Sequence, residues 1–103
     1  MKRVINGKMY NTETAELIHE SDNGIYGNDF RQCEESLYKT KNGAYFIAGS
    51  GGPMSKYAEY SGNTTSGGAG IEVISEQEAI EWLEQNDATE AIEKYFPDKI
   101  TEG

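Results

Sequence analysis

The amino-acid sequence predicts an α+β fold, in which one N-terminal helix and two C-terminal helices pack against a small antiparallel sheet with a central β-hairpin. Three observations support this prediction. An Asn-Gly turn signal separates two apolar segments in the middle of the chain. The last third of the chain has helical periodicity and helix-capping residues. The length of 103 residues fits a single domain, residues 1–103.

The N-terminal part of the chain is expected to form a hairpin followed by a helix. Residues 2–10 are predicted to form a short strand or a tight hairpin, because Asn6-Gly7 tolerates the positive φ angles of a two-residue turn. Asn11 or Thr12 is then predicted to cap a helix over residues 13–19, since the side-chain oxygen of a cap accepts hydrogen bonds from free backbone N–H groups.

The clearest turn signal is Asn42-Gly43, between the segments 35–40 and 44–49. A type I′ turn at these two residues predicts four cross-strand pairs. The pairs are Thr40 with Tyr45, Lys39 with Phe46, Tyr38 with Ile47, and Leu37 with Ala48. One face of the hairpin would then carry Tyr38, Tyr45 and Ile47, and the other Leu37, Phe46 and Ala48. Because both faces are apolar, the hairpin is expected at the centre of the sheet.

The segment 49–70 is expected to be mostly irregular, because it contains seven glycines. A short helical turn over residues 54–60 is predicted to interrupt it. The alternating residues 71–74 are predicted to form a short strand.

Two capped helices are predicted after this strand. Ser75 and Glu78 have the spacing of a capping box, in which each side chain bonds the backbone N–H of the other residue. Asp87 and Glu90 have the same spacing and are predicted to start the second helix in the same way. Pro97 is expected to end it, because proline disfavours α geometry in the residue before it.

Acidic residues outnumber basic ones and concentrate near the C-terminus. The chain has 18 Asp and Glu against 9 Lys and Arg, which gives a formal charge of −9. Residues 1–70 have a net charge of −1, whereas residues 71–103 have a net charge of −8. This balance excludes a protein that grips phosphate backbones over a broad basic surface, so no direct nucleic-acid binding is expected. It fits a basic partner, or a surface that only keeps the protein soluble.

Neither a membrane span nor a signal peptide is expected. No apolar run approaches the roughly 20 residues that cross a bilayer, and no apolar stretch follows the first basic residues. The single cysteine, Cys33, cannot form an internal disulfide, which suits a reducing cytosol. The sequence therefore predicts a cytoplasmic protein.

No motif indicates catalysis, a cofactor or a metal. The segment 49–56 matches neither G-x-x-x-x-G-K-[ST] nor G-x-G-x-x-G. Cys33 has acidic neighbours, which raise the pKa of a thiol, and the only histidine, His19, leaves a zinc site short of ligands. We therefore predict no enzyme activity, no cofactor and no metal. A pocket that joined His19, Cys33 and a carboxylate would instead favour a small enzyme or a ligand binder.

Two features remain as candidate partner-binding surfaces. The acidic C-terminal third could imitate a run of phosphates and occupy a basic groove. Its candidate residues are Glu72, Glu78, Glu81, Glu84, Glu90 and Glu93. The aromatic, glycine-rich middle of the chain is the second feature, with Tyr57 and Tyr60 as candidate anchors, because aromatic side chains contribute much of the binding energy at interfaces.

Five segments of the chain carry a family resemblance. They are Asn6-Gly7-Lys8-Met9-Tyr10 with residues 11–15, residues 35–38, 41–46 and 51–58, and the capping segment 75–83. They resemble a family of small proteins on phages and other mobile elements of Gram-positive bacteria, and the similarity covers most of residues 2–96. Some small proteins of this kind are anti-CRISPR inhibitors.

The resemblance implies a non-enzymatic inhibitor in the cytoplasm of a bacterial host cell. Its partner would be a CRISPR effector such as Cas9, whose basic channel holds nucleic acid and would be occupied by the acidic surface. The resemblance leaves one alternative open. In that alternative, the chain is an interaction module of a mobile element and binds another protein through its aromatic, glycine-rich surface.

Overall fold

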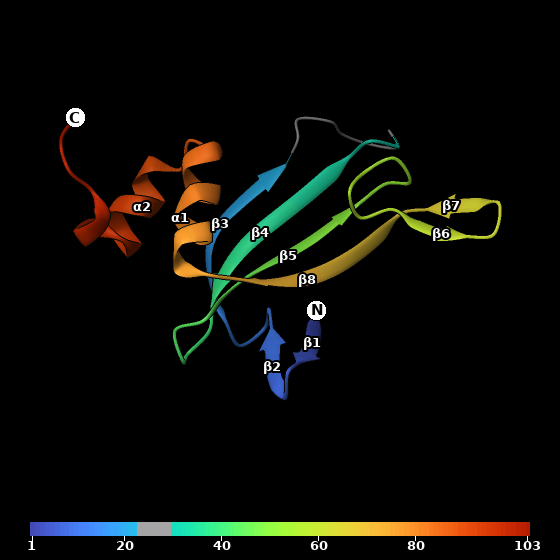
Figure 1. The fold of residues 1–103 in the computed structure, drawn as a ribbon, viewed down its shortest axis with the longest axis horizontal. Coiled ribbons are helices and arrows are strands. Elements are labelled where there is room, and N and C mark those ends of the chain that lie inside the picture. The colour runs from blue at the N-terminus through green and yellow to red at the C-terminus, as the bar shows by residue number, and fades with distance from the viewer. Residues whose placement is uncertain (23–29) are drawn as a thin grey trace.

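A computed structural model describes residues 1–22 and 30–103 of the chain (Figure 1). The strands are β1 (Lys2–Ile5), β2 (Lys8–Asn11), β3 (Glu16–Asp22), β4 (Cys33–Lys39), β5 (Tyr45–Gly51), β6 (Glu59–Ser61), β7 (Thr64–Ser66) and β8 (Gly68–Ile74). The helices are α1 (Glu76–Gln85), α2 (Thr89–Tyr95) and the short 3-10 helix η1 (Pro97–Lys99). The structure is 44% strand and 21% helical, and both α-helices are C-terminal, so the predicted fold with an additional N-terminal helix is wrong.

Four strands form the main antiparallel sheet, in the order β3-β4-β5-β8. The hairpins β1–β2 and β6–β7 are separate two-stranded sheets. The two faces of the main sheet support two apolar clusters. One joins Leu37 and Ile47 to the helices, and the other joins Phe46 and Ala48 to Tyr10 of the β1–β2 hairpin. The sheet is therefore covered by helices on one face and by the N-terminal hairpin on the other.

The molecule is elongated, with principal extents of 50 × 35 × 19 Å. Figure 1 shows the reason, because the helices gather at one end of the main sheet while the β6–β7 hairpin projects from the opposite end.

The N-terminal hairpin is confirmed, but the helix predicted after it is wrong. Asn6 and Gly7 have φ angles of 52° and 77°, as a two-residue turn between β1 and β2 requires. Asn11 does bond the following backbone, since its side chain accepts from the N–H of Glu13 at 2.9 Å and its carbonyl accepts from the N–H of Ala15 at 3.0 Å. This bonding closes only one turn, and β3 then begins at Glu16 and pairs with β4.

An irregularity in β3 explains why its residues are placed as they are. The register between β3 and β4 shifts between Leu17 and His19, so Ile18 is the extra residue of a β-bulge. Ile18 is buried in the cluster that faces the helices, and the His19 ring meets the Trp82 ring edge-on at 5.9 Å. Ile18 and His19, which are adjacent in the sequence, therefore both lie on the helix-facing side of the sheet. The strict alternation that indicates a strand in a sequence is lost at this point.

The hairpin formed by β4 and β5 is central, as predicted, but its register is not the predicted one. Lys39 pairs with Tyr45, one residue away from the predicted partner, and residues 40–44 form the loop. Within that loop Gly43 has a φ of 85°, whereas Asn42 does not have the positive φ that a type I′ turn needs. The slip changes the two faces of the hairpin. Leu37, Tyr45 and Ile47 face the helices, and Tyr38, Phe46 and Ala48 face the N-terminal hairpin.

The segment 49–70 is more regular than predicted, because β6, β7 and the first half of β8 lie within it. The helical turn predicted over residues 54–60 is wrong. Two isolated turns replace it, closed by the N–H of Ser55 on the carbonyl of Gly52 at 3.0 Å and by the N–H of Ala58 on the carbonyl of Ser55 at 3.1 Å.

The C-terminal helices follow the prediction except at one cap. Ser75 and Glu78 form the predicted capping box, with both hydrogen bonds at 3.1 Å. The predicted cap at Asp87 is wrong. Asp87 adopts a left-handed conformation with φ 53°, and Ala88 precedes α2 without a side-chain cap. The N–H of Ala88 instead bonds the carbonyl of Leu83 at 2.9 Å, which turns the chain tightly from α1 into α2.

Candidate partner-binding site

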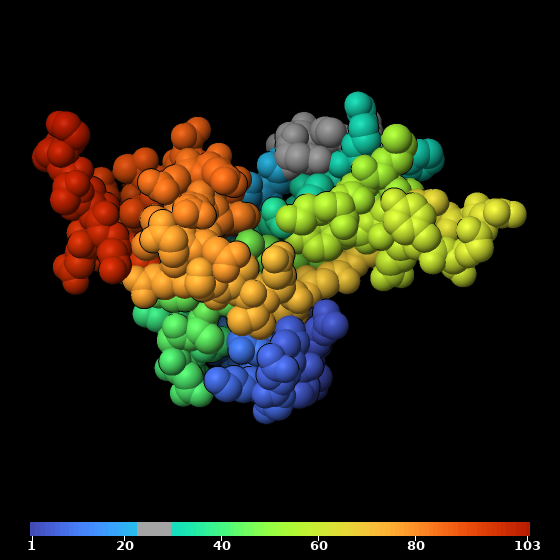
Figure 2. Space-filling view, viewed as in Figure 1, coloured from blue at the N-terminus to red at the C-terminus, as the bar shows by residue number. Residues whose placement is uncertain are grey.

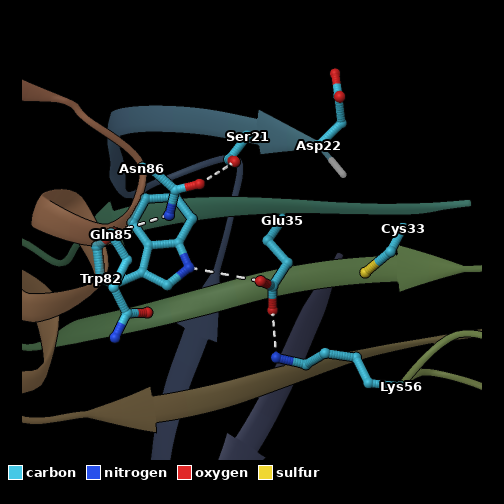
Figure 3. Close-up of a pocket in the computed structure, with 8 residues that line it drawn as sticks. All are labelled: Ser21, Asp22, Cys33, Glu35, Lys56, Trp82, Gln85 and Asn86. Atoms are coloured by element: carbon cyan, nitrogen blue, oxygen red, sulfur yellow. Dashed lines mark hydrogen bonds and ion pairs between the residues drawn. The ribbon is translucent and has the colours of Figure 1, made fainter. Parts of the chain in front are cut away.

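A cleft of about 370 Å³ opens on the helix-facing side of the main sheet, between α1 and the segment 52–58 (Figure 3). Figure 2 shows the surface hollowed between these two parts of the chain. The cleft is lined by Ser21, Asp22, Cys33, Glu35, Lys56, Trp82, Gln85 and Asn86. We call it the Glu35 cleft, because the Glu35 carboxylate contacts both Lys56 and Trp82 in its lining.

The alternation of residues along the central strands creates this cleft. Side chains on the helix-facing side of β4 alternate, so the one next to Leu37, toward the start of the strand, is Glu35. The apolar cluster beneath the helices therefore ends at Leu37. Glu35 pairs with Gly49 of β5, which leaves open space beside the carboxylate. The Tyr57 ring fills that space, since a Cβ at Gly49 would lie 2.0 Å from the Tyr57 hydroxyl oxygen. A glycine at this position is therefore what allows the segment 52–58 to lie against the sheet.

Glu35 links three parts of the fold through its carboxylate. Its Oε2 accepts a hydrogen bond from the Tyr57 hydroxyl at 2.5 Å and pairs with the Lys56 ammonium at 2.7 Å. Its Oε1 accepts a longer hydrogen bond, 3.5 Å, from the Trp82 indole N–H. Glu35 thus connects β4 to the segment 52–58 and to α1.

The electrostatics of this cluster follow from these bonds. Burial alone would raise the pKa of Glu35, but the hydrogen bonds from Lys56, Tyr57 and Trp82 outweigh it and hold the pKa below its ordinary value. The hydrogen bond to Glu35 raises the pKa of Lys56. Burial, and then the hydrogen bond to Glu35, raise the pKa of Tyr57 far above its ordinary value. At neutral pH the cluster therefore holds one carboxylate, one ammonium and a neutral phenol.

Cys33 lies in the same cleft, but its surroundings do not favour a nucleophile. Burial raises the pKa of the thiol, and the nearby Glu35 charge raises it further. The effect of acidic neighbours that the sequence indicated is therefore present, although burial is the larger cause. Among the described residues that line this cleft, Cys33 and carboxylates are present but His19 is not, because its ring packs on Trp82 outside the lining.

The predicted acidic residues lie in several separate parts of the surface. Glu78, Glu81 and Glu84 are exposed along α1, and Glu84 shares a hollow with Glu93 where α1 meets α2. Glu90 lines a different hollow, which faces β3. The helical glutamates therefore do not form one continuous face.

These helical glutamates have little compensating positive charge. Within residues 71–103, all of which the structure describes, the ion pair present joins Lys99 to Glu76 at 3.8 Å. Among the described residues, none of the five predicted helical glutamates, Glu78, Glu81, Glu84, Glu90 and Glu93, pairs with a Lys or Arg. Their negative charges are thus exposed to solvent.

Glu72 belongs with the Glu35 cleft more than with the helices. It lies on β8 opposite Ile47, on the helix-facing side of the sheet, and it is exposed. Its charge contributes to the raised pKa values of both Lys56 and Tyr57, after the larger effects of burial and of Glu35. Glu72 therefore adds negative charge beside the cleft.

The structure does not bring together the two predicted aromatic anchors. Tyr57 is partly buried against the sheet, whereas Tyr60 lies on β6 and is 78% exposed. A different apolar pair is formed instead. Phe30 and Met54 are 62% and 67% exposed, and the N–H of Met54 donates to the carbonyl of Phe30 at 2.7 Å.

Sequence reasoning missed Glu35, Lys56 and Trp82 as parts of one site. Glu35 lies on the same face of β4 as Leu37 and opposite Gly49, and this pattern could have indicated Glu35 itself. The wrong hairpin register hid it, since that register places Ser50 and not Gly49 opposite Glu35. The contact with Trp82 joins residues 47 positions apart and has no local signal.

Within the described residues, no group of three or more His, Cys, Asp or Glu side chains could hold a metal ion. Within the same part of the chain, no helix is both long enough and apolar enough to cross a membrane.

Comparisons of the chain with protein-family models, with curated proteins and with solved structures found no match. The resemblance to small proteins of mobile elements therefore stays a prediction.

Proposed function

We propose that the chain is a non-enzymatic inhibitor of a CRISPR effector such as Cas9, acting in the cytoplasm of a bacterial host cell. In this proposal its acidic surface occupies the effector's basic channel and blocks the engagement of nucleic acid. The observation that carries the proposal is the set of exposed helical glutamates without basic partners among the described residues.

The geometry of α1 supports mimicry of a phosphate backbone. Glu78, Glu81 and Glu84 follow one another at intervals of three residues, which places their Cα atoms about 4.5 Å apart along the helix axis. Phosphates of one DNA strand follow one another about every 3.4 Å along the duplex axis. The capping box holds the first turn of this helix in place. The charges are therefore presented on a fixed scaffold at a similar spacing.

The test is a charge-reversal variant in which Glu81, Glu84 and Glu93 are all changed to Lys. Glu78 is left unchanged, because its carboxylate accepts the Ser75 N–H in the capping box and its loss would weaken the helix. We expect the variant to lose protection of phage in cells that carry the susceptible CRISPR system. Its binding to the purified effector should also weaken by at least tenfold.

The matched control reverses three exposed glutamates elsewhere, Glu13, Glu20 and Glu34, and should retain inhibition. A folded helical variant that inhibits as well as the wild type would contradict mimicry by this surface. The absence of protection by the wild type across a panel of CRISPR systems would contradict the inhibitor function itself.

The exposed pair Phe30–Met54 favours a second candidate, an interaction module that binds another protein of the host or of the element. Phe30 and Met54 are both more than half exposed and their backbones are joined by a hydrogen bond, so they provide apolar surface for a partner to cover. Met54→Ala and Tyr60→Ala are the suitable probes. Tyr57→Ala is not, because Tyr57 supports Glu35. If these two changes abolish partner binding while the helical charge reversal has no effect, the second candidate is correct.

A further inference from the structure

We infer that the Glu35 cleft binds the guanidinium group of an arginine side chain presented by the partner. This inference rests on the proposed function, since basic channels that hold nucleic acid use arginine to grip phosphates. A protein that displaces nucleic acid from such a channel must supply acceptors for these arginines, and the Glu35 cleft is shaped to supply one.

The Glu35 carboxylate offers an oxygen toward the cleft. Oε2 already accepts from Tyr57 and Lys56, whereas Oε1 accepts only the long 3.5 Å bond from Trp82 among the described contacts. The carboxylate is fixed from three sides, and its side chain is 18% exposed. A fixed and mostly buried carboxylate loses little side-chain conformational entropy when it pairs with a guanidinium.

Trp82 provides a second feature that suits a guanidinium. Its indole borders the cleft on the α1 side, between Glu35 and the amide side chains of Gln85 and Asn86 (Figure 3). A guanidinium stacks on an aromatic face while it donates hydrogen bonds in its own plane. The arrangement of a carboxylate beside an indole therefore favours the planar, multiply donating group of arginine over the compact ammonium of lysine.

The charges around the cleft also favour a cation. Asp22 and Glu35 line it, and Glu72 lies beside it on β8. Lys56 is the positive residue in the lining. The raised pKa of Cys33 keeps its thiol neutral, so it does not change this balance. Among the described residues in and beside the cleft, acidic side chains therefore outnumber Lys and Arg.

Lys56 shows that the Glu35 carboxylate accepts a cation, and it can be displaced. Its side chain is 57% exposed, so its ion pair with Glu35 is partly solvated and contributes little to stability. An arginine that forms two hydrogen bonds and stacks on Trp82 can replace it, after which the Lys56 ammonium returns to solvent. Removal of the Lys56 charge should therefore strengthen arginine binding.

The test uses Trp82 as its reporter, because it is the only tryptophan in the chain. The purified protein is titrated with N-acetyl-arginine amide, with N-acetyl-lysine amide and with the neutral citrulline analogue. Tryptophan fluorescence and the NMR signal of the indole N–H are both followed. We expect a saturable response to the arginine compound, a weaker response to the lysine compound, and none to the citrulline analogue.

Single substitutions test which side chains bind the arginine compound. Glu35→Gln should weaken arginine binding by about tenfold or more, because a charged hydrogen-bond acceptor is lost. Lys56→Gln should strengthen it by about threefold. Glu72→Gln, at an exposed position beside the cleft, should weaken it without disturbing the fold. Glu90→Gln, which lies in a different hollow, is the matched control and should leave binding unchanged.

Thermal unfolding checks that each variant is folded, and Glu72→Gln and Lys56→Gln keep the test decisive if Glu35→Gln does not fold. No saturable arginine response, or equal binding by the wild type and Lys56→Gln, would overturn the inference.

These measurements need no effector. If arginine binds while the helical charge reversal leaves inhibition intact, the cleft is correct and mimicry by the helices is wrong. If the reversal abolishes inhibition while arginine does not bind, the opposite holds.

Discussion

At the scale of single residues, the Glu35 carboxylate joins β4 to the segment 52–58 and to α1. It accepts hydrogen bonds or an ion pair from three residues that belong to two other parts of the chain. A carboxylate in such a position is costly to bury but more costly to leave without partners. The same contacts that fix it for a guanidinium also hold the segment 52–58 against the sheet, so binding and stability are coupled at this residue.

Glu35 should make the stability of the protein depend on pH. Its pKa is held below its ordinary value of 4.5, so its contribution is fully present above that pH and is lost as the pH falls through the lowered value. We expect Glu35→Gln to reduce the free energy of unfolding by about 2 kcal/mol at pH 7. The difference from the wild type should shrink below pH 4.5, because the wild-type carboxyl then becomes neutral as well.

Urea denaturation from pH 3 to pH 7 measures this dependence. Glu90→Gln serves as the control, since Glu90 is exposed and forms no ion pair among the described residues. A difference between Glu35→Gln and the wild type that stays constant over this pH range would show that the carboxylate charge is not what stabilises the cluster.

At the scale of elements, the sequence predicted what local chemistry determines and failed where distant partners decide. The capping box at Ser75 and the turn at Asn6-Gly7 are set by neighbouring residues, and both are confirmed. The segment after Asn11 has a real cap but becomes a strand, because pairing with β4 satisfies its backbone and buries Ile18. Two-residue and five-residue loops are both possible around Asn42-Gly43, so the predicted register between β4 and β5 differs by one residue from the observed one.

The candidate functional residues also divide into those that local sequence predicts and those that only the assembled fold brings together. Exposed glutamates on α1 could be predicted from helical periodicity, since the outward side of an amphipathic helix is polar. The Glu35 cleft could not, because Glu35 meets Lys56 and Trp82 only after β4, β5 and α1 have been assembled. Tyr57 was singled out as an anchor for a partner, but it packs over Gly49 within the chain.

The packing of the segment 52–58 on β5 gives a prediction with a matched control. Gly49 and Gly70 are paired across β5 and β8, and neither has a positive φ. A Cβ at Gly49 would overlap the Tyr57 ring, whereas a Cβ at Gly70 would meet nothing within 4 Å. We expect Gly49→Ala to destabilise the protein by about 2 kcal/mol or more, because Tyr57 must leave the sheet.

Gly70→Ala should be neutral or stabilising by a few tenths of a kcal/mol, since alanine loses less conformational entropy than glycine on folding. Thermal unfolding of both variants, together with the fluorescence of Trp82, measures the effect. Equal stability of the two variants would show that the contact between Tyr57 and Gly49 contributes little.

At the scale of the whole molecule, opposite charges are separated between different parts of the fold. Residues 71–103 have a net charge of −8, whereas the segments 1–12 and 37–48 together contain five Lys or Arg and no Asp or Glu. Lys8 and Lys41 line one hollow of about 420 Å³ between the β1–β2 hairpin and the loop 40–44. The net charge of −9 is therefore unevenly distributed: residues 71–103 contribute −8, the basic part formed by the segments 1–12 and 37–48 contributes +5, and the rest of the chain contributes −6.

This separation affects how fast the protein meets a basic partner. In the proposed complex the helices approach the positive channel, so the basic part contributes only repulsion at long range. Replacement of Lys2, Lys8 and Lys41 by Gln should raise the association rate with the effector severalfold at low salt and leave the dissociation rate nearly unchanged. The gain should diminish at higher salt, because ions screen exposed charges beyond about 10 Å at 0.1 M. Surface plasmon resonance at two salt concentrations measures both rates. A faster dissociation of this variant would instead place the basic part in contact with the partner or with the partner's nucleic acid. The basic part, and not the helices, would then face the channel.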